Sequence, residues 1–207
     1  MAKLKLTKGE LKRQRDALKQ FQRYLPTLQL KKQQLQLEIL QQSFSVREKK
    51  QILIKKRQAI DLWVSLLADP QVDFSLFLKP DKIVTHLKNI AGCDIPIFDA
   101  VEFQTPSYDL FVMPLWLDLG IEAFKEVIAL NKAILVTEES VSILRHELRI
   151  TTQRVNLFEK VKIPSAEENI RLIKICIGDQ MANAVGRSKI AKRKIEEIIL
   201  EEAIVLH

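Results

Sequence analysis

The sequence predicts a mostly α-helical protein. Its N- and C-terminal arms are expected to form a long antiparallel two-helix coiled coil, with a small α+β insert containing a short β-hairpin between them. Charged residues make up 29% of the 207 residues, aromatic residues only 6%, and there are five glycines, none between Glu10 and Ala91. Leu, Lys, Gln and Glu, which dominate the chain, favour helices. So few aromatic residues favour a pair of elongated helices over one large core. We expect three parts: an N-terminal helix over 1–68, the insert over 69–120 and a C-terminal helix over 121–207.

The N-terminal arm carries a row of leucines seven residues apart: Leu4, Leu11, Leu18 and Leu25. This spacing is typical of a coiled-coil seam. Several later seam positions are polar, which predicts looser packing there: Gln14, Gln42, Lys49 and Lys56. Pro26 lies inside the arm and removes a helical hydrogen bond. The helix therefore either bends just before Pro26 or begins afresh after it.

The C-terminal arm has apolar residues at helical spacing from Phe124 to Ile198. Opposite charges four residues apart, such as Lys192 and Glu196, support a solvated helix. Neither arm can bury its apolar stripe alone, so the two arms are expected to pair.

The insert differs sharply in composition, with five of the seven prolines and seven of the thirteen aromatic residues. The segment "DKIVTHLKNIAG" predicts a short helix closed by Gly92 as its C-cap. The runs "IPIFDAVEF" and "YDLFVMPLW", on either side of "QTPS", predict a hairpin.

The net charge of +7 is unevenly distributed, since residues 1–60 hold 16 Lys and Arg but only 4 Asp and Glu. Such a basic segment indicates an acidic partner, which could be a protein, a membrane surface or nucleic acid. The alternative is a solubilising helix face.

The sequence contains little that predicts catalysis. It has no P-loop, GxGxxG or GxSxG motif, and its three histidines lack metal-ligand spacing. The pairs of adjacent glutamates would point about 100° apart on a helix, so they would not converge. We expect no catalytic residue, metal or cofactor. Cys93 and Cys176 are interpreted as buried or idle thiols in a reducing compartment. No apolar run reaches the length of a membrane span, so a soluble, cytoplasmic protein is expected.

The stretch "TTQRVNLFEKVKIP", residues 151–164, ends in a proline within an otherwise helical pattern. Ser165 and Glu168 have the spacing of a capping box. Either one helix ends at Pro164 and Ser165 caps the next, or one helix kinks and continues.

Three motifs of this chain, in this order and spacing, resemble those of the D subunits of rotary V/A-type ATPases. The first is "LTKGELKRQRDALK" at residues 6–19, the second "NIAGCDIPIFD" at 89–99, and the third the pattern RVN…E…IP from Arg154 to Pro164. The resemblance runs essentially from end to end. The residues that match the motifs, and are therefore candidates for family-specific and partner-interface positions, are Thr7, Lys8, Leu11, Gly92, Pro96, Phe98, Arg154, Val155, Asn156, Glu159, Ile163 and Pro164.

The resemblance implies a non-catalytic central-stalk subunit, or rotor shaft, peripheral to the membrane. Its two termini would enter the hexamer of catalytic and non-catalytic subunits. Its other end would meet the small F subunit of the central stalk and the socket subunit above the membrane ring. It would transmit torque between ATP hydrolysis or synthesis and ion translocation. Pro26 departs from the expected straight first helix.

Two other functions remain open from the residues themselves. One is a coiled-coil adaptor or tether. The other is a basic coiled coil that binds nucleic acid, although its basic residues are interleaved with the seam and its aromatic residues lie elsewhere.

Overall fold

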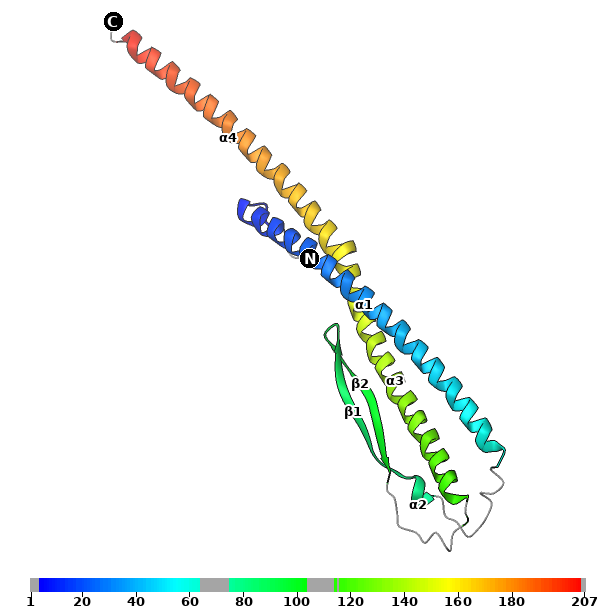
Figure 1. Ribbon diagram of the computed structural model, residues 1–207. Helices are drawn as coiled ribbons and strands as arrows, with labels where there is room; N and C mark the ends of the chain where they lie inside the picture. Colours follow the sequence, from blue (N-terminus) through cyan, green and yellow to red (C-terminus); the bar gives the residue numbers. More distant parts are fainter. Residues whose placement is uncertain (1–3, 64–74, 104–113, 115, 206–207) are drawn as a thin grey trace. The chain divides into compact units, whose positions relative to one another are not determined.

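The structure is a computed structural model, and it describes residues 4–63, 75–103, 114 and 116–205. Helix α1 (Lys8–Asp61) is followed by the short helix α2 (Ser75–Leu78) and by strands β1 (Pro80–Ile90) and β2 (Cys93–Phe103). Helix α3 (Leu117–Leu157), the π-helical turn η2 (Phe158–Lys162) and helix α4 (Ile163–Val205) complete the chain (Figure 1). The predicted fold class, with long N- and C-terminal helices and an antiparallel hairpin, is confirmed.

These elements fall into two compact units. One is Leu30–Thr152, here called the hairpin unit; the other joins residues 1–29 to residues 153–207 and is called the termini unit. Helices α1 and α3 each contribute to both units. The division of the chain at residues 68 and 120 stays a prediction.

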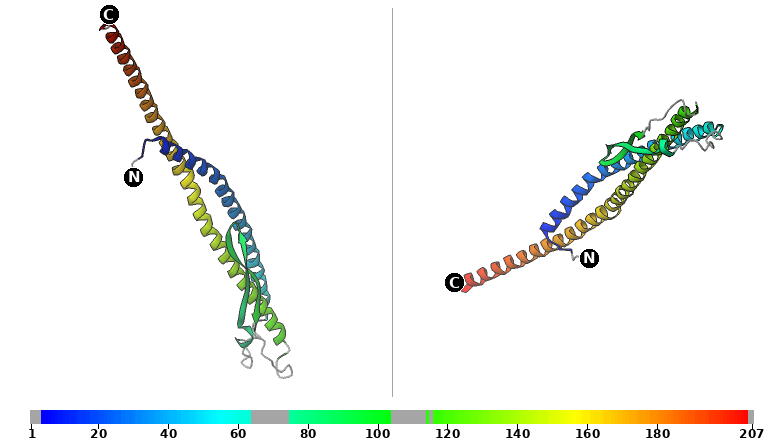
Figure 2. Two further views of the ribbon diagram at one scale, coloured as in Figure 1. Left: turned by 90° about the vertical axis from the view of Figure 1, so that its left-hand side faces the viewer. Right: turned by 90° about the horizontal axis from the view of Figure 1, so that it is seen from below.

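In the hairpin unit, α1 and α3 lie side by side and run in opposite directions, with the hairpin beside them (Figures 1 and 2). The direction follows from the contacts, because Lys31 pairs with Glu147 whereas Lys50 pairs with Glu138. One buried cluster of this unit is formed by Leu35 of α1, Leu144 of α3 and Ile95 of β2, all completely buried. The hairpin thus supplies one of the three side chains of this cluster.

In the termini unit, the start of α1 pairs with η2 and α4, again antiparallel. Leu11 lies near Ile177 and Met181, whereas Phe21, further along α1, packs against Phe158. The buried apolar residues of this unit recur at helical spacing, as expected for a seam: Val155, Ala166, Ile170 and Ile173.

The prediction of a helix over "DKIVTHLKNIAG" is wrong, because residues 80–90 form β1. Strand β1 pairs antiparallel with β2, with Ile90 opposite Cys93, so Ala91 and Gly92 form a two-residue turn. Both turn residues have positive φ, 52° and 76°. This fits the type I′ turn that matches the twist of paired strands. A glycine with positive φ serves a helix C-cap and a hairpin turn equally well, and here it serves the turn.

The segment "IPIFDAVEF" is a strand, as predicted. It lies within β2 and pairs with β1, which precedes it. The expected partner "YDLFVMPLW" lies almost entirely outside the described residues. β-branched residues in the middle of β1, Val84 and Thr85, favour the strand that is found.

Helix α1 continues through Pro26, so the alternative of a second helix beginning after that proline is wrong. The hydroxyl of Thr27 donates a hydrogen bond of 2.8 Å to the carbonyl oxygen of Tyr24. The carbonyl that loses its usual N–H donor to the proline is that of Gln22, four residues earlier.

Pro164 does not mark a helix boundary, because the π-helical turn η2 leads directly into α4. The Ile163 N–H donates to the carbonyl oxygen of Phe158, five residues earlier, which is the π-helical pattern. A proline ring clashes with the carbonyl four residues before it, and a wider turn at that point relieves the clash. Of the two alternatives, the one in which Ser165 caps a new helix is therefore wrong: Ser165 lies inside α4, and Glu168 binds Arg171 instead.

Candidate subunit interfaces

Among the described contacts that hold the hairpin against α3 are a partly buried hydrogen bond and the buried side chain of Ile95, with Ile90 and Ala91 packed beside it. The Ser140 hydroxyl is positioned to donate to the carbonyl oxygen of Pro96 at 2.5 Å, and it also lies 3.0 Å from the carbonyl of Val136. Ser140 is only 2% exposed, and the neighbouring Ile95 is completely buried. Of the motif residues here, Gly92 lies in the turn and Phe98 is half-buried opposite Thr85. The hairpin is therefore held by β2, while most of β1 is exposed.

Lysines of α1 reach across to α3 along the hairpin unit. Lys31 pairs with Glu147 at 2.8 Å, Lys50 with Glu138 at 2.6 Å, and Lys56 with Glu126. Lys49 donates to the Thr137 hydroxyl oxygen at 3.1 Å. Two of the polar seam residues, Lys49 and Lys56, are thus partnered by α3. Each exposed pair adds little stability, but together they fix how α1 aligns with α3.

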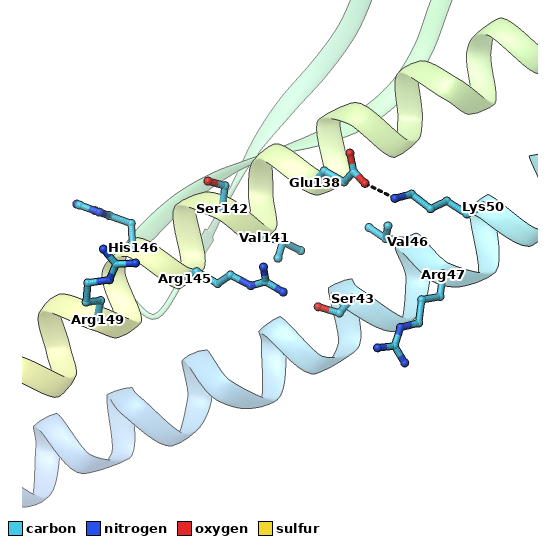
Figure 3. Close-up of a pocket in the computed structure, with 10 residues that line it drawn as sticks. All are labelled: Ser43, Val46, Arg47, Lys50, Glu138, Val141, Ser142, Arg145, His146 and Arg149. Carbon is cyan, nitrogen blue, oxygen red and sulfur yellow. Dashed lines mark ion pairs between the residues drawn. The ribbon is translucent and has the colours of Figure 1, made fainter.

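A basic groove of about 630 Å³ lies between α1 and α3 in the same unit (Figure 3). Arg47 comes from α1, and Arg145 and Arg149 come from α3, one helical turn apart. None of these three arginines forms an ion pair with a described residue. Its ten lining residues are Ser43, Val46, Arg47, Lys50, Glu138, Val141, Ser142, Arg145, His146 and Arg149.

An apolar groove lies next to the basic one along α1. It is lined by Gln33, Gln36, Leu37, Ile39, Leu40 and Leu148. Leu37 and Leu40 are about two-thirds exposed, as is the nearby Phe44. Large apolar side chains exposed together in this way are typical of a protein–protein contact.

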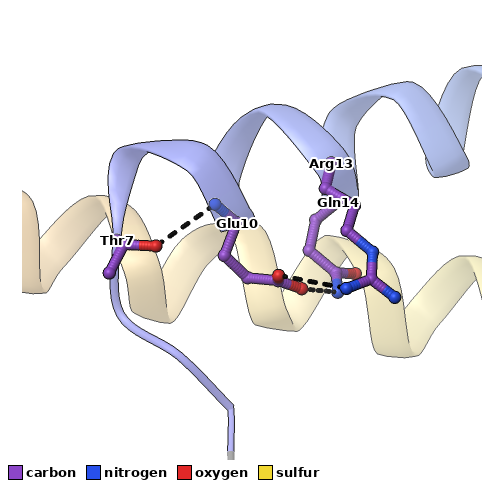
Figure 4. Close-up of polar contacts among 4 residues, drawn as sticks. All are labelled: Thr7, Glu10, Arg13 and Gln14. Atoms are coloured by element: carbon purple, nitrogen blue, oxygen red, sulfur yellow. Dashed lines mark hydrogen bonds and ion pairs between the residues drawn. The ribbon is translucent and has the colours of Figure 1, made fainter.

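In the termini unit, α1 begins with a side-chain cap (Figure 4). The N–H of Glu10 donates to the Thr7 hydroxyl oxygen at 3.3 Å, the usual role of an N-cap threonine. The Glu10 carboxylate accepts a hydrogen bond from Gln14 and pairs with Arg13. Lys8 and Leu11 follow in the first turn and line a shallow groove with α4.

Beyond this pairing, α4 continues as an exposed helix. Every residue from Gly178 to Ile199 is exposed, including the large apolar Val185, Ile190 and Ile195. Basic side chains alternate with them, such as Arg193, which pairs with Glu197 at 3.3 Å. This part of α4 exposes both apolar and charged side chains, and no described residue packs over them, so it is a candidate interface.

The third motif spans the end of α3, the π-turn and the start of α4. Val155 is 4% exposed and belongs to the core of the termini unit. Arg154, Asn156 and Glu159 are exposed, as is Pro164, whereas Ile163 is half-buried. The motif thus combines one buried residue and one half-buried residue with four exposed ones.

The sequence-predicted residues divide between the two units. Gly92, Pro96 and Phe98 belong to the hairpin unit, and the groups around Thr7 and Arg154 belong to the termini unit. No hydrogen bond or ion pair among the described residues joins these last two groups.

Sequence reasoning missed the three groove arginines and Ser140. Arg145 and Arg149, like charges four residues apart with no acidic residue three or four positions from either, were the available signal for the groove. Ser140 gave no signal, because its bond to Pro96 joins residues 44 positions apart.

Cys93, at the start of β2, lies near Lys31 and two acidic residues. Burial and the Glu147 carboxylate raise the pKa of the Cys93 thiol, with a smaller contribution from Asp94, while Lys31 opposes them. A raised pKa keeps the thiol protonated and weakly nucleophilic.

Neither a metal centre nor a membrane span is found in the described part of the chain. There, no group of three or more His, Cys, Asp or Glu side chains is placed to hold a metal ion. Among the same residues, no helix combines the length and apolarity needed to cross a membrane.

Comparison with known proteins places these features in a family. The family model for the D subunit of ATP synthase matches residues 10–193. A protein of Borreliella burgdorferi, named as the D subunit of V-type ATP synthase, is 46% identical over 195 residues, covering 94% of this chain and 96% of the relative. The same-named proteins of Chlamydia pneumoniae and Chlamydia caviae are 34% and 32% identical; they cover 93% and 95% of this chain, and 93% and 95% of their own lengths. The chain therefore belongs to the family of ATP synthase D subunits.

Proposed function

We propose that this chain is the non-catalytic central-stalk subunit of a V/A-type ATPase, the shaft that transmits torque between the catalytic hexamer and the membrane ring. The observation that carries the proposal is the match to the family of D subunits along residues 10–193, over the same helices that pair in the structure. The adaptor and the nucleic-acid-binding coiled coil are not favoured, because the relatives carry the name of an ATP synthase subunit.

The helix pairing suits a shaft that must resist twisting. A single helix twists easily, whereas two helices with interdigitated side chains must shear their contacts in order to twist. The α1–α3 pairs at Lys31, Lys50 and Lys56 oppose such sliding. Beyond Gly9, in its first turn, α1 contains no glycine, which is the most flexible residue.

The interfaces divide by unit in this proposal. The exposed part of α4, residues 178–199, would enter the hexamer of catalytic and non-catalytic subunits together with the capped start of α1. The hairpin unit would meet the small F subunit of the stalk and the socket subunit above the membrane ring. The chain would supply no catalytic group, since ATP would be hydrolysed or made in the hexamer.

Co-purification tests this function. The tagged chain is purified from its native host at low and at high salt, and ATPase activity and subunit stoichiometry are measured. We expect a complete hexamer with ATPase activity at both salt concentrations. Recovery of nucleic acid that is lost at high salt, or of scaffold proteins without ATPase activity, would contradict the proposal.

A further inference from the structure

We propose that the basic groove between α1 and α3 binds an acidic helical segment of another protein, through carboxylates that pair with Arg47, Arg145 and Arg149. The first observation is that the positive charges of these three arginines are not paired with a carboxylate of the groove. These three guanidinium groups line one groove, and the groove's only carboxylate, Glu138, is taken by Lys50 at 2.6 Å. Like charges one turn apart on α3 repel each other, so the arrangement favours an anionic partner.

The second observation is the type and spacing of the charged residues. Arginine presents a planar fork of donors that binds a carboxylate with two parallel hydrogen bonds. Arg145 and Arg149 are four residues apart on one helix, and carboxylates three or four residues apart on a facing helix have the same spacing. An acidic helix lying along the groove would therefore meet both arginines at once.

The third observation is the continuity of the basic groove with the apolar groove. One face of α1 lines both grooves, because its groove residues recur three or four positions apart. From the apolar groove these are Gln36 and Leu40, and from the basic groove they are Ser43, Arg47 and Lys50. On α3, Leu148 of the apolar groove lies between Arg145 and Arg149. The site thus places apolar and cationic side chains side by side along its length, which fits an amphipathic acidic helix.

Nucleic acid fits this surface less well. Proteins that bind single strands combine basic side chains with aromatic rings on which the bases stack. No Phe, Tyr or Trp is among the ten lining residues of the basic groove. Its floor is formed by the small apolar Val46 and Val141, which suit the methylene groups of a glutamate-rich helix.

Photo-crosslinking tests the inference in the whole complex. Benzoylphenylalanine replaces Ser43, which lines the groove, and the tagged chain is irradiated in complexes purified from the native host. We expect an adduct that mass spectrometry maps to a protein segment with carboxylates three or four residues apart. Arg145→Glu should reduce its yield about tenfold, as expected for the loss of a charged bidentate pair.

Lys55→Glu is the matched control. Lys55 is exposed, forms no ion pair with a described residue and lies off the groove face of α1, and its reversal changes the net charge by the same amount. Its adduct yield should equal that of the unsubstituted chain. In the Arg145→Glu background, changing the mapped carboxylates to lysine should restore the adduct.

Other outcomes overturn the inference. They are an adduct with nucleic acid or lipid, an adduct with a protein segment lacking carboxylates, and the absence of any adduct. An equal loss of adduct yield in Arg145→Glu and Lys55→Glu would also overturn it. The inference rests on the groove and not on the proposed function, and ATPase activity of the same material separates the two. An adduct with an acidic segment in material without ATPase activity would contradict the proposed function alone. Complexes with ATPase activity but without such an adduct would contradict only the inference.

Discussion

Phe21 of α1 and Phe158 of η2 pack edge to face, with ring centroids 5.3 Å apart and ring planes at 65°. The contact joins the N-terminal arm to the π-helical turn that precedes Pro164. It therefore places an aromatic pair at the point in the termini unit where the helix geometry departs from the α form.

This pair should couple energetically. Phe21→Ala and Phe158→Ala should each destabilise the chain, and a double-mutant cycle should give a coupling of about 0.5–1.5 kcal/mol. The free energy of unfolding in urea measures it. Tyr24→Ala, at a position on α1 that is more than half exposed, serves as the control and should add independently to Phe158→Ala. Additive effects of Phe21→Ala and Phe158→Ala would show that the ring contact contributes nothing of its own.

The Ser140–Pro96 hydrogen bond should hold the hairpin on α3. Ser140→Ala leaves the Pro96 carbonyl without its donor in a partly buried place, and this should cost about 1–3 kcal/mol. Amide hydrogen exchange should become faster in β1 and β2. Ser142→Ala, two residues further along α3 at an exposed position, is the matched control and should change neither measurement. Unchanged exchange in Ser140→Ala would mean that Ile95 alone fixes the hairpin.

The raised pKa of Cys93 predicts a specific pH dependence. Because the folded thiol holds its proton more tightly than the unfolded one, its contribution to stability is complete below the unfolded pKa and is lost as pH rises through the folded pKa. Glu147→Gln should lower the thiol pKa, and Lys31→Met should raise it, since these groups act in opposite directions. Both are measured by maleimide reactivity against pH in a Cys176→Ser background. The same pKa in both variants would exclude Glu147 and Lys31 as causes.

The exposed part of α4 should matter for assembly and not for the chain's own stability. Deleting the chain from Arg187 onward removes residues 187–199, all of whose side chains are exposed. The midpoint of unfolding in urea should therefore change little. Co-purification of the ATPase hexamer should be lost. A truncated chain that still recovers an active, stoichiometric hexamer would show that this segment is not the interface with the head.

The helices could be predicted from sequence because their signals are local and repeated. The seven-residue leucine spacing from Leu11 to Leu25 in α1, and the apolar spacing of α4, recur over several turns, so a single polar residue does not obscure them. The β-hairpin was harder to predict from the sequence. Residues 81–92 satisfy a helix with a glycine C-cap as well as a strand with a glycine turn, and their pairing with β2, which contacts α3 at Pro96, favours the strand.

The prolines show the same limit of local information. Pro164 has the flanking residues of a helix boundary, yet packing of Val155 and Ile170 on either side keeps the helix continuous, and a π-turn absorbs the proline. The basic groove needed both helices together, because Arg47 and Arg145 are almost a hundred residues apart in sequence. Only the pairing of α1 with α3 brings them to one site.

Rotation tests the central claim most directly. The catalytic hexamer is immobilised with this chain in place, and a bead is attached through a cysteine introduced at Lys88, an exposed residue of β1, after both native cysteines are replaced by serine. On addition of ATP, a shaft should turn the bead continuously in one direction. A bead that stays at rest while the same complexes hydrolyse ATP would contradict the account.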